Sequence, residues 1–304
     1  MAVMTTAAFA KFMWPGVNSA YGMSYKEYPL EYPNFFKTYN STKNYEEDQG
    51  LSGFGQAIEK PEGTAITYDD ATQAFVDRYT HVTYGLGFIV TRENIEDWVG
   101  PGKAINKATA LGHSMRNTEE TLGSLVLDRS FTSTYSYGDG KELCATDHPN
   151  QAGGTWSNEA ATASDLSEAA IEQAFTDIGL FKDDRGLQIP VNAKKLIVHY
   201  SGLPNAHRLL HAKLRPTTSD NDPNWTKDSG MFPEGVFGSH FTSDVDSWWI
   251  ITDCPNGMKH YSRRKPEFKI DDDFDTENSK FKATFRSSYG CTDKRGIYGV
   301  VGAS

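Results

Sequence analysis

The chain has few cysteines, no long apolar segment and no complete catalytic or metal-binding motif. Cysteine occurs only three times in 304 residues, at positions 144, 254 and 291, and no CxxC pair is present. An odd and sparse set of this kind argues against a disulfide scaffold and is typical of a reducing cytoplasm. No segment approaches the roughly 18 continuous apolar residues that a membrane-spanning helix needs, so the sequence predicts no membrane partner.

Positive charge is also scarce. The chain has 30 Lys and Arg against 40 Asp and Glu, which gives a net charge of −10 and a pI of about 5.3. Tight nucleic-acid binding requires Lys and Arg to neutralise phosphates, so this chain is a poor candidate for sequence-specific binding. A protein that merely encloses nucleic acid stays compatible with this charge, because a wall that repels DNA lets the polymer slide.

Complete catalytic or metal-binding motifs are missing as well. Cys144, Asp147 and His148 lie close together in CATDHP, but no second ligand pair occurs at a suitable spacing. His207 and His211 lie four residues apart and would share one face of a helix, yet no acidic general base sits beside them. The sequence therefore predicts no catalytic residue, no metal site and no cofactor.

The chain does have enough length and apolar content for a substantial core, with 304 residues of which 38% are hydrophobic. Residues 1–53 are rich in Tyr, Phe, Pro and Asn and show no helical period, which predicts an irregular arm held by aromatic side chains. Its first segment, MAVMTTAAFAKFMWPG, has no basic region before its apolar part, so we expect an arm and not a signal peptide. Such an arm needs a surface to lie on, in its own domain or in a neighbour.

Residues 54–91 predict a long hairpin. TAITYDDA and DRYTHVTYGLGFIVT are rich in β-forming residues, and KPEG at 60–63 supplies a turn. A two-stranded ribbon is not stable alone in water, so an extended one implies a partner surface.

The rest of the chain predicts an α+β fold. Apolar residues recur at helical spacing over 102–129 and again over 165–181, where Ser164 or Ser167 could be the N-cap. A buried strand is expected at 194–200 and a third helix at 203–214. The C-terminal region predicts antiparallel hairpins: one over 247–264 that turns at Pro255-Asn256-Gly257, a strand at 268–270, and a closing hairpin that pairs 281–286 with 297–301.

Two segments resemble a known family. CPNGMKHYSRRKPEFKIDDDFDTENSKFKATFRSSYGCTDKRGIYG, at 254–299, resembles the C-terminal core of the major capsid proteins of tailed double-stranded-DNA bacteriophages, including the Mu-like major head subunit group. CATDHPNQAGGTWSN resembles the loop that follows the long helix in the same group. The resemblance implies the Hong Kong ninety-seven type capsid fold.

That resemblance also implies a division of the chain and a role. It implies an N-terminal arm at 1–53, an E-loop hairpin at 54–91, a P-domain with its spine helix at 92–150, an A-domain at 151–240, and the P-domain sheet with the C-terminus at 241–304. It implies self-assembly, in the host cytoplasm, of hexamers and pentamers into the icosahedral virion capsid that encloses DNA. Portal and scaffolding proteins are implied partners, and a decoration protein is a further candidate. No long charged helical leader precedes the arm, so scaffolding is expected from a separate protein.

Charged residues in this framework are candidate contacts between subunits. The acidic run at 271–275 follows closely on Arg263 and Arg264, which indicates pairing either within one subunit or between subunits. The full candidate set is Lys60, Glu62, Arg263, Arg264, Asp271, Asp272, Asp273, Arg286 and Arg295.

Two other functions compete with a phage head. An encapsulin-like bacterial nanocompartment would share the fold but enclose a cargo protein. A soluble metal-dependent hydrolase would use Cys144, Asp147, His148 and the histidines near 207, and it would be a monomer or a small oligomer. The phage-like ending and the long aromatic arm favour the phage head.

Overall fold

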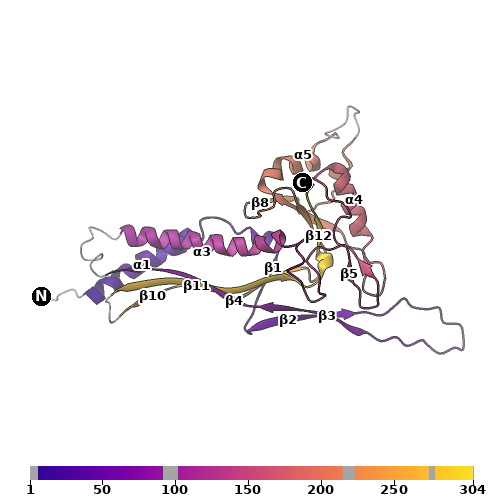
Figure 1. Ribbon diagram of the computed structural model, residues 1–304, viewed down its shortest axis with the longest axis horizontal. Coiled ribbons are helices and arrows are strands. Elements are labelled where there is room, and N and C mark those ends of the chain that lie inside the picture. The colour runs from indigo at the N-terminus through magenta and orange to yellow at the C-terminus, as the bar shows by residue number, and fades with distance from the viewer. Residues whose placement is uncertain (1–5, 92–101, 215–222, 274–277, 304) are drawn as a thin grey trace.

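The computed structural model describes residues 6–91, 102–214, 223–273 and 278–303. Figure 1 shows a long flat arm on one side, a thicker body on the other, and a narrow hairpin that projects from beneath the body. The helices are α1 (Thr6–Tyr25), α3 (Gly102–Asp128), α4 (Glu168–Gly179), α5 (Leu203–His211) and α6 (Trp225–Asp228), with short 3₁₀ turns at η1 (Tyr32–Asn34), η2 (Tyr200–Gly202) and η3 (Lys294–Gly296). No helix among these residues is long and apolar enough to cross a bilayer.

The arm is a sheet covered by two helices. Its described strands run in the order β1-β10-β11-β4, from β1 (Lys37–Asn40), β10 (Met258–Asp272), β11 (Ser279–Cys291) and β4 (Val82–Val90). Phe281, Ala283 and Phe285 alternate along β11 with polar residues and are buried beneath α3 and α1. Gly112 lets α1 approach α3 closely, since a Cβ there would lie 3.0 Å from the Tyr21 carbonyl oxygen.

Two buried glutamates of α3 fasten the aromatic segment that follows α1. Glu120 accepts hydrogen bonds from the backbone N–H of Glu31 at 2.9 Å and of Tyr32 at 3.0 Å. Glu119 accepts hydrogen bonds from the hydroxyls of Tyr25 and Tyr32. Burial raises the pKa of both carboxyls, although these hydrogen bonds act in the opposite direction.

The body contains a second sheet, ordered β12-β9-β7-β8 among the described strands. Its members are β7 (Ala193–His199), β8 (Val236–Ser239), β9 (Trp248–Thr252) and β12 (Ile297–Val300). Trp248 packs among residues of α4 and α5, whereas Trp249 packs on the other face with Leu127 of α3. Strand β9 is therefore buried on both faces and joins the body to the arm. A two-stranded ribbon, β5 (His148–Pro149) with β6 (Thr155–Trp156), flanks it.

The projecting hairpin pairs β2 (Tyr45–Ser52) with β3 (Thr72–Thr80), and residues 53–71 connect them. Two ion pairs fix its base. Lys259 Nζ lies 2.7 Å from Asp48 Oδ2, and the buried Lys294 Nζ lies 2.7 Å from Asp77 Oδ2.

Several predicted elements are confirmed by the structure. The helix predicted over 102–129 is α3, and the helix predicted over 165–181 is α4, whose N-cap Ser167 accepts a hydrogen bond from the Ala170 N–H. The strand at 194–200 is β7 and the helix at 203–214 is α5. Each ends within a few residues of its expected bound.

The hairpin and the arm differ from the prediction. The paired strands of the hairpin are 45–52 and 72–80, whereas TAITYDDA is not a strand and 82–90 belongs to the sheet of the arm. The N-terminal arm is not irregular throughout, because α1 fills 6–25. Val17, Ala20, Tyr21 and Ser24 are buried at helical spacing, a period that the apolar residues before them and Pro15 obscure in the sequence.

Both predicted C-terminal hairpins are wrong. Strands β9 and β10 lie in different sheets, and so do β11 and β12, while β10 pairs with β11. Between β9 and β12 the chain therefore crosses between body and arm twice. The two crossings touch, because a Cβ on Gly296 would lie 2.4 Å from the Cα of Gly257.

Candidate assembly surfaces

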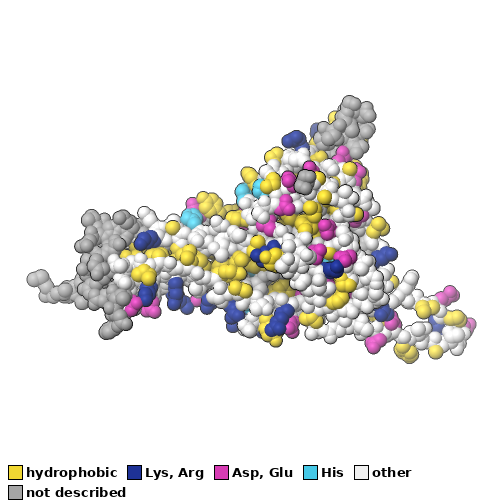
Figure 2. Space-filling model, viewed as in Figure 1, with side chains coloured by type: hydrophobic (Ala, Val, Ile, Leu, Met, Phe, Trp, Pro, Cys, Tyr) yellow, Lys and Arg dark blue, Asp and Glu magenta, His cyan; other side chains and the backbone are white. Residues whose placement is uncertain are grey.

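The loop at 53–71 is the most exposed part of the described chain, and we call it the projecting loop. Every residue from 56 to 70 is exposed, including Lys60 and Glu62 at its tip. It carries large apolar side chains that are exposed to solvent: the exposed fraction of the surface is 75% for Ile58, 64% for Ile66 and 91% for Tyr68. Figures 1 and 2 show this loop standing clear of the body, with apolar and charged side chains side by side.

The base of the projecting loop is fastened to the body. Both oxygens of Asp69 accept hydrogen bonds from Arg185 Nη2, at 2.7 and 2.5 Å, and Asp69 Oδ2 also accepts one from the Gly55 N–H at 2.8 Å. The Gly55 hydrogen bond and then Arg185 lower the pKa of the Asp69 carboxyl to about 2. The loop therefore has a defined point of departure, although its tip is exposed.

The face of the arm opposite α3 is basic. Along β10 and β11, Arg264 lies across from Arg286, Lys269 across from Lys282, and Asp271 across from Lys280. Like charges directly opposite one another are unfavourable, so this arrangement has a cost within a single subunit. We call the five cationic residues Arg264, Lys269, Lys280, Lys282 and Arg286 the basic face. Figure 2 shows Lys and Arg side chains along the lower edge of the arm.

Three arginines of the candidate set donate hydrogen bonds to neutral groups in their own subunit, and of these Arg264 is exposed while Arg263 and Arg286 are half-buried. Arg263 Nε donates to the Lys43 carbonyl at 2.9 Å, and Arg264 Nη2 donates to Thr284 Oγ1 at 3.2 Å. Arg286 donates to the carbonyl of His81 and to the Asn44 side chain.

The described part of the acidic run pairs with a lysine of β11. Asp273 forms an ion pair with Lys280, while Asp271 is exposed. Neither aspartate pairs with Arg263 or Arg264 among the described side chains. The Asp272 side chain and residue 275 lie outside the described residues.

Arg295 differs from the other candidates because it is buried, with 8% of its surface exposed. Its guanidinium donates to Asp184 at 2.9 Å and to the Lys182 carbonyl at 2.7 Å. Its central carbon lies 4.4 Å from the ring centre of Trp156. Its contacts are therefore internal and join η3 to the body.

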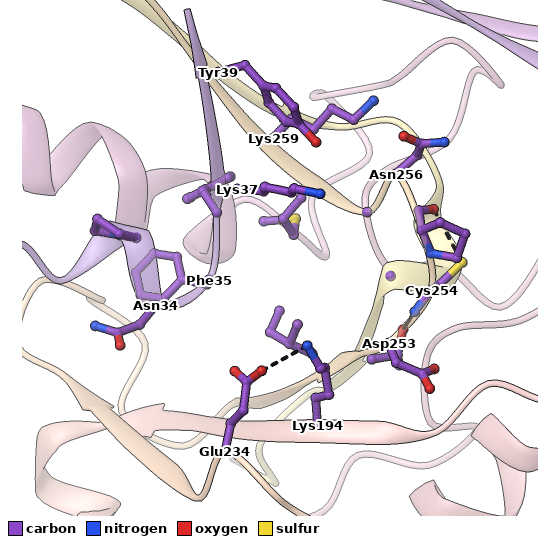
Figure 3. Close-up of a pocket in the computed structure, with 18 residues that line it drawn as sticks. Asn34, Phe35, Lys37, Tyr39, Lys194, Glu234, Asp253, Cys254, Asn256 and Lys259 are labelled. Carbon is purple, nitrogen blue, oxygen red and sulfur yellow. Dashed lines mark hydrogen bonds and ion pairs between the residues drawn. The ribbon is translucent and has the colours of Figure 1, made fainter.

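A cavity of about 390 Å³ lies between residues 33–39 and the connection from β9 to β10 (Figure 3). Lys37 and Lys259 line one side, and the ion pair of Lys194 with Glu234 lines the other. The Cys254 thiol donates to Asp293, and burial raises its pKa. Since a protonated thiol is a poor nucleophile and the described lining holds no histidine, the cavity lacks a nucleophile–base pair.

The residues considered as candidates for a metal site are buried or held by hydrogen bonds and an ion pair. Cys144 is fully buried, and burial raises its pKa. His148 is held by Asp139 at 2.7 Å and Asn158 at 2.9 Å, whereas Asp147 pairs with Lys141. Over the described ranges, no three His, Cys, Asp or Glu side chains gather in a way that could hold a metal ion.

Comparisons with known proteins agree with this architecture. A family model described as "Phage capsid protein" matches residues 75–300. The capsid of a native GTA particle has a TM-score of 0.59 with 10% identity, over 91% of this chain and 92% of that one. The Mycobacterium phage Cain structure gives 0.56 with 10% identity, over 91% of each chain. The capsid of the Myoviridae phage XM1 gives 0.50 with 12% identity, over 89% and 90%. No curated protein sequence matches.

The described elements and these neighbours share the Hong Kong ninety-seven type capsid fold, with mixed helices and sheets. The family match covers most of the chain, so the chain belongs to the phage capsid protein family. It is a structural major capsid protein that forms the phage head, and not an enzyme. The nanocompartment and hydrolase alternatives are thereby set aside, while the Mu-like subgroup stays a prediction.

Proposed function

We propose that neighbouring subunits of the head hold one another through the projecting loop of one subunit and the basic face of the next. The exposure of Ile58, Ile66 and Tyr68 on the projecting loop carries this proposal. Bare apolar side chains on an extended element mark an interaction site. Covering each one fully would favour association by about 1.5–3 kcal/mol.

Charge supports the same pairing. The tip segment holds Glu59 and Glu62 against a single Lys60, whereas the five cations of the basic face outnumber the acids among them, Glu267, Asp271 and Asp273. Two of the five cations are already paired, Lys269 with Glu267 and Lys280 with Asp273. Opposite charges of this kind steer encounter and fix register more than they add affinity. The candidate contacts that we retain are Lys60, Glu62, Arg263, Arg264, Asp271, Asp272, Asp273 and Arg286. Arg295, which is internally satisfied, takes a role within the subunit.

This proposed contact between subunits is consistent with a division of the chain into an N-terminal arm, an E-loop, a P-domain and an A-domain. We assign residues 1–53 to the N-terminal arm except for β2 at 45–52, which belongs to the hairpin, 92–150 to the spine part of the P-domain, 151–240 to an A-domain and 241–304 to the P-domain sheet. The E-loop, expected at 54–91, corresponds to the β2–β3 hairpin with its projecting loop. Contacts between unlike surfaces close into rings of five and six, and a shell multiplies contacts that are individually weak.

The other proposed partners are proteins that a phage head would require. Portal and scaffolding proteins, and a decoration protein as a further candidate, would bind the assembled shell, which forms in the host cytoplasm. The net charge of −10 favours enclosure of DNA without sequence-specific binding.

Deleting residues 60–63 tests the central contact. The fold of the subunit should survive, since Asp69, Arg185 and Gly55 fasten the base of the loop and lie outside the deletion. We expect a melting temperature within about 2 °C of the wild type and loss of most of the particle fraction. Size-exclusion chromatography and electron microscopy measure the particles.

A double variant, Lys60→Ala with Glu62→Ala, keeps the loop length and removes only the tip charges, so it separates the contribution of those charges from that of the loop itself. A deletion that still assembles into normal shells would contradict the proposed role of the loop.

A further inference from the structure

Strand β4 is an open edge of the arm sheet. It ends the order β1-β10-β11-β4, and no described strand pairs with its outer side. Its nine residues, VTYGLGFIV, include neither a charge nor a proline. Val82, Leu86 and Ile89 are each about half exposed, Leu86 at 50%.

Such an edge is unusual in a protein that stays alone. A free strand presents unpaired N–H and C=O groups to any other extended chain, and proteins normally protect it with lysine, proline, a bulge or a covering element. Strand β1, at the opposite edge, is only four residues long and begins with Lys37. Strand β4 is longer, uncharged and apolar, which is typical of a surface that receives another strand.

The projecting loop contains a strand-forming segment that has no partner. Residues 64–68, TAITY, combine β-branched and aromatic residues, and the sequence predicts a strand there. In the structure they pair with no described strand and are all exposed. The Thr64 N–H donates to the Pro61 carbonyl, which closes the turn just before them. This conflict between local preference and structure disappears if the segment joins a sheet in another molecule.

The charges around the two segments are complementary in part, since acids outnumber Lys60 beside the loop segment and lysines lie beside β4, of which Lys280 is already paired with Asp273. Glu59, Glu62 and Asp70 flank the loop segment. Lys280 and Lys282 lie beside β4 in the register of the sheet, opposite Ile89 and Gly87. Lys107 Nζ lies 6.0 Å from the ring centre of Phe88 on the other face.

We propose that residues 64–68 of one subunit add as a strand to the free edge of β4 in a second copy of the chain. The arm sheet then becomes β1-β10-β11-β4 followed by the segment of the neighbour. Backbone hydrogen bonds supply part of the affinity, and side chains at alternate positions supply the rest. This inference rests on the proposed function and names the segment and the edge through which the loop holds its neighbour.

Cysteine cross-linking between two sets of subunits tests it. Leu86→Cys subunits are co-assembled, one mixture at a time, with subunits that carry a cysteine at position 65, 66, 67 or 68, and are then oxidised mildly. Facing residues of paired strands have Cα atoms about 4.5–5.5 Å apart, which a disulfide spans. Cys144 and Cys291 are buried and burial raises the pKa of Cys254, so wild-type particles should give little background.

Strand addition has a signature that simple proximity lacks. Alternate residues of a strand point to opposite faces, so the yield of linked dimer should alternate with a period of two along 65–68. One parity should exceed the other several-fold. Thr38→Cys, on the opposite edge of the same sheet, should give no dimer with any of the four positions.

Three results of the cross-linking between subunits alone would overturn the inference. They are equal yields at all four positions, linkage to Thr38→Cys instead of Leu86→Cys, or absence of linkage in well-formed particles. All three would leave the proposed function standing, whereas normal particles from the 60–63 deletion would remove both. Linkage of position 66 or 68 only to an added scaffold or decoration protein would likewise reject a second copy as the occupant.

A charge at the edge provides a second test that needs no cysteine. Leu86→Lys should reduce particle yield several-fold without changing the melting temperature of the subunit, because a lysine protects an edge strand. Leu180→Lys is the matched control, since Leu180 is a comparably exposed apolar residue outside the arm sheet. Equal yields from the two variants would count against the β4 edge.

Discussion

At the scale of single residues, His260 shows how burial makes this fold sensitive to acid. It lies opposite Thr38, where β1 pairs with β10, and its ring stacks on Tyr289 with ring centres 4.4 Å apart. Its Nε2 is buried and has no hydrogen-bond partner in the part of the chain that the structure describes. Burial lowers the pKa of His260 to about 4, since nothing compensates a charged ring there.

The sign of the effect follows from linkage. The folded pKa lies below the unfolded value of about 6.5, so the neutral ring contributes its full stability above that value and loses it as pH falls towards 4. The loss amounts to at most about 3 kcal/mol.

We expect His260→Phe to reduce the acid sensitivity of the subunit. Phenylalanine keeps the stacking on Tyr289 but cannot be protonated, so the fall in melting temperature between about pH 7 and about pH 4.5 should shrink. Thermal unfolding of unassembled subunits measures it. The exposed His211→Phe is the control and should leave the pH dependence unchanged. A variant with the full acid sensitivity of the wild type would assign that sensitivity to other groups.

At the scale of elements, the two crossings between arm and body restrict what the chain tolerates. Gly257 and Gly296 meet backbone to backbone, so a Cβ on Gly296 would overlap the Gly257 Cα, whereas a Cβ on Gly257 would be tight at 3.0 Å from the Gly296 Cα. A flexible side chain could move aside, but a second backbone in a connection between two sheets cannot.

Gly296→Ala should therefore destabilise the subunit strongly, by about 1–3 kcal/mol, as other overpacking substitutions do. The new Cβ would lie 2.4 Å from the Gly257 Cα. Gly179→Ala is the control, since a Cβ at that position would have no atom within 4 Å and the backbone there does not require glycine. Denaturant unfolding of both variants measures the difference, and equal stabilities would show that the crossing is looser than these distances indicate.

The sequence predicts elements better than their partners. Helix α3 and strand β7 follow from their own apolar periods, which are local properties of the chain. The pairing of β10 with β11, and of β9 with β12, depends on which sheet each strand joins after the turn at Pro255-Asn256-Gly257. That turn looks like a hairpin in the sequence, but it connects two sheets. The choice is made by burial over the whole molecule and leaves no local signal.

The candidate contacts also divide into those whose surroundings the sequence indicates and those whose surroundings it does not. Lys60 and Glu62 could be placed on an exposed tip because Pro61 and Gly63 mark a turn. The burial of Arg295 could not be foreseen, since its partners Asp184 and Trp156 come from distant parts of the chain. The apolar edge at β4 does not emerge from the sequence, because its residues read as part of the hairpin. Its lack of any charge over nine residues is the available signal.

At the scale of the whole molecule, folding and assembly depend on different arginines. Arg295 is buried and paired, so Arg295→Ala should cost roughly 3 kcal/mol of stability. Arg263→Glu with Arg264→Glu should change the melting temperature little, because both side chains donate hydrogen bonds only to neutral groups among the described residues, while lowering particle yield. Comparing particle yield with unfolding temperature for both variants tests this separation. Unchanged yield with a lowered melting temperature in the double variant would place those arginines in an internal role.

The contact at Gly257 and Gly296, between the β9–β10 and β11–β12 connections, also forms a joint between the body and the long arm. Strand β10 has 15 residues and therefore extends about 50 Å from the joint, so a rotation of about 5° there moves its far end by about 4 Å. Two covalent connections that press against each other resist bending more than a single one would. A small angular adjustment at this joint is thus converted into a large displacement at the rim of the subunit, where the curvature of a closed container is decided.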